Sequence, residues 1–258
     1  MHIAGVLLCP WICLIAADPA LPSQIGDVST SRHTSTVMVP FVGCKSDGQL
    51  GPLEAPAGRT ESLSISTGAA YLAYYKAKNG FGVLAPRHWH CFSTYGSSGS
   101  SLYVSPEPID PARLFSQSWK GFSGPLIQVS VSDGGTSGRF QVAKTIARVF
   151  PDYRQSVRDV IAESIEPASS FPVGPYPHDK LTYRSRRIVE FETSAEADGL
   201  GTDSRLQSNT DPIMGVAILF GGDPSLVQLS ARLPAQDREM TRVIIERVER
   251  EVAHSEVQ

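Results

Sequence analysis

Apolar and polar residues alternate along much of the chain, and this pattern predicts a protein rich in β-strands. An apolar run at 37–42 predicts one strand, and runs at 81–84 and 102–104 predict two more, one on each side of a histidine-containing motif. Residues 126–131 and 139–144 alternate on both sides of an Asp-Gly-Gly turn, which predicts a β-hairpin.

Other segments carry apolar residues at helical spacing. Segment 66–76 begins with a serine and a threonine that are suited to cap a helix. Asp110 followed by Pro111 predicts the start of a short helix, and residues 151–164 carry an apolar stripe. Pro234 precedes the last predicted helix, whose apolar stripe consists of Met240, Val243, Ile244, Val248 and Val252.

The C-terminal part combines strands with that last helix. Strands are predicted at 187–192, 213–220 and 227–233. The third alternates strictly, so we expect a half-buried strand whose solvent-facing residues are Gln228, Ser230 and Arg232. Strands followed by a covering helix indicate an α+β fold, with antiparallel sheets and helices packed on one face.

The proline-rich segment 167–177 is the best candidate for a boundary within the chain. We therefore divide the sequence into a signal peptide at 1–17, a flexible arm at 18–36, an N-terminal α+β region at 37–166, a proline-rich connection at 167–178 and a C-terminal region of β-sheet plus helix at 179–258.

The first residues have the character of a secretory signal peptide. Residues 3–17 are uncharged, end in small residues at Ala16 and Ala17, and are fewer than the roughly 20 needed to cross a bilayer. No Lys or Arg precedes this run, so a buried N-terminal strand or helix is the alternative. No later stretch has transmembrane length. We expect a periplasmic or secreted protein that is not an integral membrane protein.

Composition supports a globular fold and argues against one class of partner. Hydrophobic residues make up 41% of the 258 residues, which is enough for a sizeable core. The formal net charge is −3. Nucleic-acid binding requires a basic face, so we expect no nucleic-acid partner.

Export changes the interpretation of the cysteines. Cys9 and Cys13 would leave with the signal peptide, and Cys44 and Cys91 would remain. A lone pair in an oxidising compartment usually forms a disulfide, which would stabilise the fold by about 4 kcal/mol in the chain-entropy model.

The motif RHWHCFSTYGSSGSS at 87–101 holds the candidate functional residues. A metal site at His88, His90 and Cys91 is possible in principle. On a strand, however, the two imidazoles would share one face and the cysteine would lie on the other. The glycine–serine run does not match the Gly-x-Ser-x-Gly nucleophile motif and favours a turn. We therefore assign no catalytic residue, metal or cofactor. We predict first a supporting strand, in which Trp89 and Cys91 face the core while His88 and His90 face solvent or a cleft. The alternative is a binding surface of aromatic residues beside a mobile turn, formed by His88, Trp89, His90, Tyr95, Ser97 and Ser98.

Three segments resemble a family of uncharacterised exported bacterial proteins: GVLAPRHWHCFSTYGS at 82–97, VGCKSDGQ at 42–49, and Arg-Leu-Pro at 232–234. Members of this family usually carry glycine at the position of His88. The resemblance implies export and paired cysteines, and it carries no known activity.

These observations favour a non-catalytic binding or interaction module of the cell envelope, whose partner is an unknown envelope protein or a small ligand. The alternative is a periplasmic hydrolase that uses His90 with Cys91 or with a bound metal. Titration of free thiols distinguishes the two hypotheses.

Overall fold

The computed structural model describes residues 35–65 and 71–256. The predicted signal peptide and residues 18–34 of the predicted arm lie outside this part of the chain, as do residues 66–70 at the start of one predicted helix. Ser35 and Thr36, the last residues of the predicted arm, belong to the first strand.

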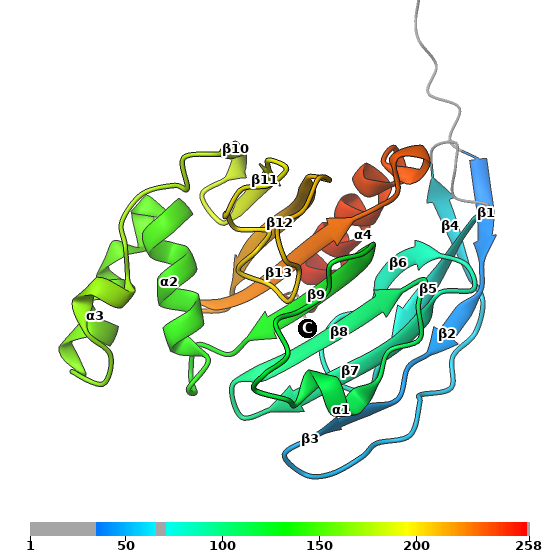
Figure 1. Ribbon diagram of the computed structural model, residues 1–258, viewed down its shortest axis with the longest axis horizontal. Helices are drawn as coiled ribbons and strands as arrows, with labels where there is room; N and C mark the ends of the chain where they lie inside the picture. The colour runs from blue at the N-terminus through cyan, green and yellow to red at the C-terminus, as the bar shows by residue number, and fades with distance from the viewer. Residues whose placement is uncertain (1–34, 66–70, 257–258) are drawn as a thin grey trace, which may run out of the picture. The chain divides into compact units, whose positions relative to one another are not determined.

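An eight-stranded sheet is the centre of the fold (Figure 1). Neighbouring strands run antiparallel, except that β3 and β7 are parallel. In spatial order the strands are β10 (Asp179–Ser185), β11 (Ile188–Thr193), β12 (Ile213–Phe220), β13 (Ser225–Arg232), β9 (Leu126–Ser132), β8 (Gly99–Ser105), β7 (His90–Gly96) and β3 (Ser46–Gly48). Because β13 pairs with β9, the sheet includes strands from both sides of the proline-rich segment.

One face of this sheet is covered by a second layer of strands and a helix. The strands are β2 (Phe41–Gly43), β5 (Leu72–Lys76) and β6 (Val83–Pro86), and the helix is α4 (Met240–Ser255). A single apolar core contains Leu84 of β6, Ile244 of α4 and Leu229 of β13. A two-stranded sheet of β1 (Ser35–Val39) and β4 (Glu61–Ile65) contacts β5.

The opposite face carries α2 (Arg139–Val149) and α3 (Arg154–Ala162). Strand β12 shows how the helices are divided. Val216 and Ile218 pack in the core with α4, whereas Ala217 and Leu219 pack in a second core with α2 and α3. Successive side chains of a strand point to opposite faces, so the helices lie on both faces of the sheet and are not gathered on one.

The α+β class, the large antiparallel-rich sheet and a disulfide between Cys44 and Cys91 are confirmed. The short helix α1 (Pro111–Leu114) begins where predicted, because the Asp110 carboxylate accepts a hydrogen bond from the Ala112 backbone N–H. Short 3-10 turns at Pro151–Tyr153, Ala168–Ser170 and Ala235–Asp237 complete the regular structure. None of the helices in the described ranges is long and apolar enough to span a bilayer.

Two sequence predictions were wrong about the type of element. The predicted second hairpin strand at 139–144 is the first half of α2, whose buried residues Val142, Ile146 and Val149 recur at helical spacing. A six-residue window cannot distinguish this spacing from alternation. The predicted helix up to residue 76 is instead strand β5 from Leu72 onward, which is buried on both faces between β2 and β6. Such a strand has a continuous apolar run, as a buried helix does.

Strand β13 also differs from its predicted half-buried state. The residues expected to face solvent are covered: Gln228 is 6% exposed, and Ser230 and Arg232 are almost fully buried. The Arg232 guanidinium donates to the backbone carbonyls of Ser123, Gly124 and Gln207, and burial lowers its pKa. Loops that are distant in sequence cover this face.

Candidate functional site

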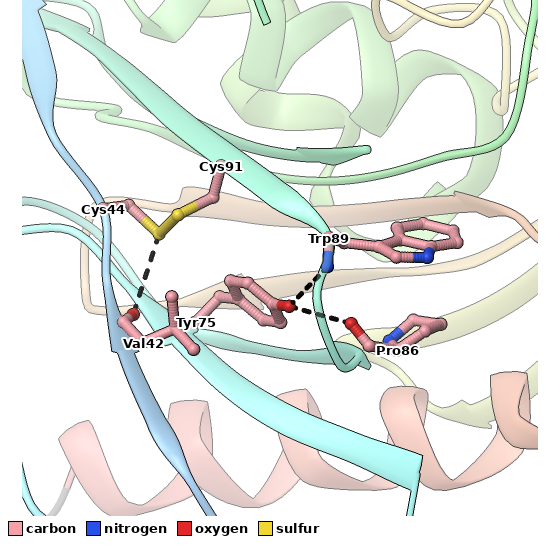
Figure 2. The surroundings of a disulfide bond; sticks show 6 residues. All are labelled: Val42, Cys44, Tyr75, Pro86, Trp89 and Cys91. Atoms are coloured by element: carbon pink, nitrogen blue, oxygen red, sulfur yellow. Dashed lines mark hydrogen bonds between the residues drawn. A yellow bond between two sulfur atoms is a disulfide. The ribbon is translucent and has the colours of Figure 1, made fainter. Parts of the chain in front are cut away.

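The disulfide anchors the motif that the sequence singled out (Figure 2). Cys44 follows β2 in the covering layer, and Cys91 lies on β7 of the large sheet. Their Cα atoms are 5.5 Å apart, and Cys44 is buried. The bond therefore joins the two layers, and neither sulfur is a free nucleophile.

Trp89, two residues before Cys91, packs against the core. Its side chain is half-buried against the main apolar cluster. Its backbone N–H donates to the Tyr75 hydroxyl over 3.1 Å, and that hydroxyl donates to the Pro86 carbonyl over 2.8 Å (Figure 2). Burial raises the pKa of Tyr75 to about 12, so the phenol stays protonated as a donor.

Both histidines of the motif are exposed, but they occupy different kinds of backbone. His90 begins β7, whereas His88 lies in the preceding turn with φ of 68°. The alternation argument that placed both imidazoles on one strand face therefore does not apply. Positive φ favours glycine, so His88 holds a backbone conformation that residues with a side chain rarely adopt. Among the described residues, no group of three His, Cys, Asp or Glu side chains could hold a metal ion.

The glycine–serine run forms the turn between β7 and β8, as predicted. Ser97 and Ser98 are exposed at its tip. Gly99 has φ of 137°, and a Cβ there would lie 1.8 Å from the Val131 carbonyl oxygen, so the close approach of β9 requires glycine. Tyr95, near the end of β7, donates its hydroxyl to the Gly51 carbonyl over 2.6 Å.

The six predicted binding residues therefore do not form one surface. His88, Trp89 and His90 lie at the start of β7, while Tyr95, Ser97 and Ser98 lie at its end. At about 3.4 Å per residue, the two ends of this strand are about 20 Å apart. Tyr95 and Ser98 border a cleft that the histidines do not line.

That cleft, of about 730 Å³, lies on the face of the large sheet that carries α2. Its floor consists of side chains from β7, β8, β9 and β13. Its walls are the start of α2 at 137–144, residues 203–205, and Leu114 and Phe115 at the end of α1. A volume of this size is typical of sites for small molecules.

Polar side chains form the centre of the floor. Thr94, Ser101, Ser130 and Gln228 are register partners in succession from β7 to β13, so they form one row across the strands. The hydroxyl oxygens of Ser101 and Ser130 are 2.8 Å apart, and the Gln128 amide nitrogen donates to Ser130 over 2.7 Å. The Gln128 amide oxygen accepts from the Arg205 backbone N–H over 2.8 Å, which fixes one wall to the floor.

Two cations and two anions line the cleft, and one of them, Arg205, is exposed and forms no ion pair within the described ranges. Lys144 and Glu166 form an ion pair with an N–O distance of 2.9 Å. Asp203 accepts a 2.8 Å hydrogen bond from the Tyr176 hydroxyl. Although part of Asp203 is exposed, neighbouring protein atoms displace water from its carboxyl group and raise its pKa, while Tyr176 and Arg148 oppose the rise.

The sequence contained a signal for this floor, which we interpreted differently. Gln128 and Ser130 interrupt the apolar run of β9, and Gln228 and Ser230 interrupt that of β13. We assigned the polar residues of β13 to an open solvent face. Pairing between β9 and β13 instead places Gln228 beside Ser130 in the cleft, whereas Ser230 and Arg232 are buried outside its lining.

The chain matches no protein-family model, no curated protein and no solved structure.

Proposed function

We propose that this protein works outside the cytoplasm as a non-catalytic binding protein, and that it holds a small polar ligand in the cleft on the α2 side of the sheet. One observation carries the proposal. Gln228 is 6% exposed and lines the cleft, and its amide nitrogen donates to the Leu200 carbonyl over 2.8 Å.

The Leu200 carbonyl oxygen is an acceptor, so the atom of Gln228 beside it must be the amide nitrogen. This fixes the orientation of the side-chain amide and leaves its oxygen pointing away from Leu200. Within the described ranges this oxygen accepts no hydrogen bond, since the Leu200 contact is the only side-chain hydrogen bond of Gln228. The oxygen is not among the buried side-chain atoms that lack a partner, so it is open to the cleft, where a bound ligand can donate a hydrogen bond to it in place of water.

The residues around the cleft favour binding over catalysis. Its serines have no histidine or cysteine beside them among the lining residues, and Lys144 is held by Glu166. A serine nucleophile normally requires an adjacent base. The compartment is supported by the Cys44–Cys91 disulfide, since such bonds persist mainly in oxidising environments, and by the signal-like first residues.

The test is to export the full chain into a bacterial periplasm, purify it without denaturation, and record native mass spectra. We expect a small-molecule adduct that is released on unfolding. Adding a low-molecular-weight periplasmic extract to ligand-free protein should raise the midpoint of thermal unfolding.

Gln228→Leu should abolish both effects. Gln236→Leu is the matched control, because Gln236 is exposed and lies outside the cleft. The absence of both adduct and thermal shift, or an adduct equally present in Gln228→Leu, would contradict the proposal.

A further inference from the structure

We infer that the ligand of the cleft is a neutral saccharide, recognised through the polar row formed by Thr94, Ser101, Ser130 and Gln228. This inference rests on the proposed function and specifies its ligand. The row crosses β7, β8, β9 and β13, whose spacing of about 4.8 Å gives it a length of about 14 Å. That length suits two or three sugar rings lying across the strands.

The hydroxyl and amide hydrogens of the polar row show which hydrogen-bond donors and acceptors remain for a ligand. Gln128 donates to the Ser130 oxygen, and of the paired hydroxyls of Ser101 and Ser130 one must donate to the other. Whichever donates, the second hydroxyl hydrogen has no partner within the pair. Gln228, the next residue of the row, contributes the unpaired amide oxygen.

The floor thus presents a hydroxyl donor in the same row as the carbonyl acceptor of Gln228. The donor is Ser130, the register partner of Gln228, if Ser101 donates within the pair, and it is Ser101, one strand further along, if Ser130 donates. Adjacent hydroxyl groups of a sugar match this arrangement, because each hydroxyl both donates and accepts.

Charge and backbone geometry argue against other ligand classes. The residues of the row are uncharged, and Lys144 is paired with Glu166. Arg205 on one wall is the other cation of the lining, and Asp203 lies two residues before it, so a phosphate-bearing ligand finds little compensation along the row. A peptide would normally pair its main chain with an exposed sheet edge. Here the floor is a sheet face, whose backbone groups are already used between strands.

Aromatic side chains also border the cleft, and they suit the apolar faces of sugar rings. Phe115 is 53% exposed, which is unusual for phenylalanine, and Phe140 of α2 is half-buried on the opposite wall. The apolar C–H face of a sugar ring gains free energy by covering such surface.

The experiment is calorimetry and saturation-transfer NMR on ligand-free protein with defined probes. The saccharides are maltotriose, chitotriose and mannotriose, and the non-sugar probes are trialanine and adenosine. We expect at least one saccharide to bind, and Gln228→Leu to weaken it about tenfold. Ser101→Ala with Ser130→Ala should weaken it by a similar factor, which keeps the test valid if Gln228→Leu does not fold.

The matched control is Ser116→Ala with Ser118→Ala, another hydrogen-bonded serine pair, 2.9 Å apart and outside the cleft lining, which should leave affinity unchanged. Binding of trialanine or adenosine but of no saccharide would overturn the ligand class and leave the proposed function standing. The same conclusion follows if no probe binds while a Gln228-dependent adduct is present. If no probe binds and no adduct or thermal shift is found, both proposals fail.

Discussion

The two faces of the large sheet are formed by the same strands, yet one is a closed apolar core and the other carries the polar cleft. In β13, Leu229 is fully buried in the core beneath α4, while its neighbour Gln228 lines the cleft on the other face. The first face is closed by a second layer and a disulfide. The second face keeps polar groups with unsatisfied hydrogen-bonding capacity. Alternation along a strand thus lets one segment stabilise the fold on one side and offer recognition groups on the other.

The largest effect should come from the disulfide that fastens the covering layer to the sheet. Replacing both Cys44 and Cys91 by serine should lower the free energy of unfolding by about 4 kcal/mol, because the unfolded chain regains the entropy of the closed loop. Denaturant unfolding measures this loss. Two free thiols in the freshly exported native protein would contradict both the bond and the proposed compartment.

The next effect compares the two faces directly. Leu229→Ala should cost about 2 to 5 kcal/mol, because it opens a cavity in the closed core. Ser101→Val, on the cleft face, should cost less than about 1 kcal/mol, since it removes one hydroxyl pair from an open site. Denaturant unfolding of both variants tests the contrast. Equal losses would mean that the cleft face is also packed for stability.

A smaller effect, of opposite sign, is expected where the chain passes from the covering layer to the sheet. His88 lies at positive φ in the turn between β6 and β7, so His88→Gly should raise the unfolding free energy by up to about 1 kcal/mol. His90→Gly, on the strand, should destabilise the protein and serves as the control. Thermal unfolding of both variants distinguishes backbone strain from loss of an imidazole contact.

The smallest effect concerns the wall of the cleft. Arg139, at the start of α2, donates to Glu163 through Nε and a terminal nitrogen, and this lowers the pKa of the Glu163 carboxyl group. A lowered pKa contributes stability above the unfolded-state value of about 4.3, and the contribution is lost as pH falls through the folded-state pKa. Glu163→Gln should therefore flatten the acid side of the pH–stability curve slightly, since the pair is screened by solvent. Thermal unfolding at several acidic pH values measures the slope of stability against pH. An unchanged slope in Glu163→Gln would show that the ion pair does not contribute to stability.

Much of the fold could be predicted from the chain itself. The apolar positions of β12, β13 and α4 were visible because local periodicity determines them. The disulfide was predicted from the number of cysteines that would remain if the first residues were removed as a signal peptide. Strand β5 was misassigned because a strand that is buried on both faces has a continuous apolar run and shows no alternation. Helix α2 was misassigned because a window shorter than two helical turns cannot distinguish the helical period of 3.6 residues from the strand period of two.

The site was harder to predict for a specific reason. Its row joins Thr94, Ser101, Ser130 and Gln228, and only the register between strands places them together. The motif around His90 was conspicuous in composition, yet it occupies a turn and a strand end, where Trp89 and Cys91 support the core.

The outer edge of the sheet has a consequence for how copies of the protein meet one another. Strand β10 is an edge strand whose Lys180 and Arg184 are paired with glutamates of β11. An irregularity between Tyr183 and Ser185 also interrupts the register of this strand. Charged side chains and bulges on an edge strand both disfavour pairing with the edge of a second copy. The edge should therefore resist fibre-like stacking even when the protein is crowded.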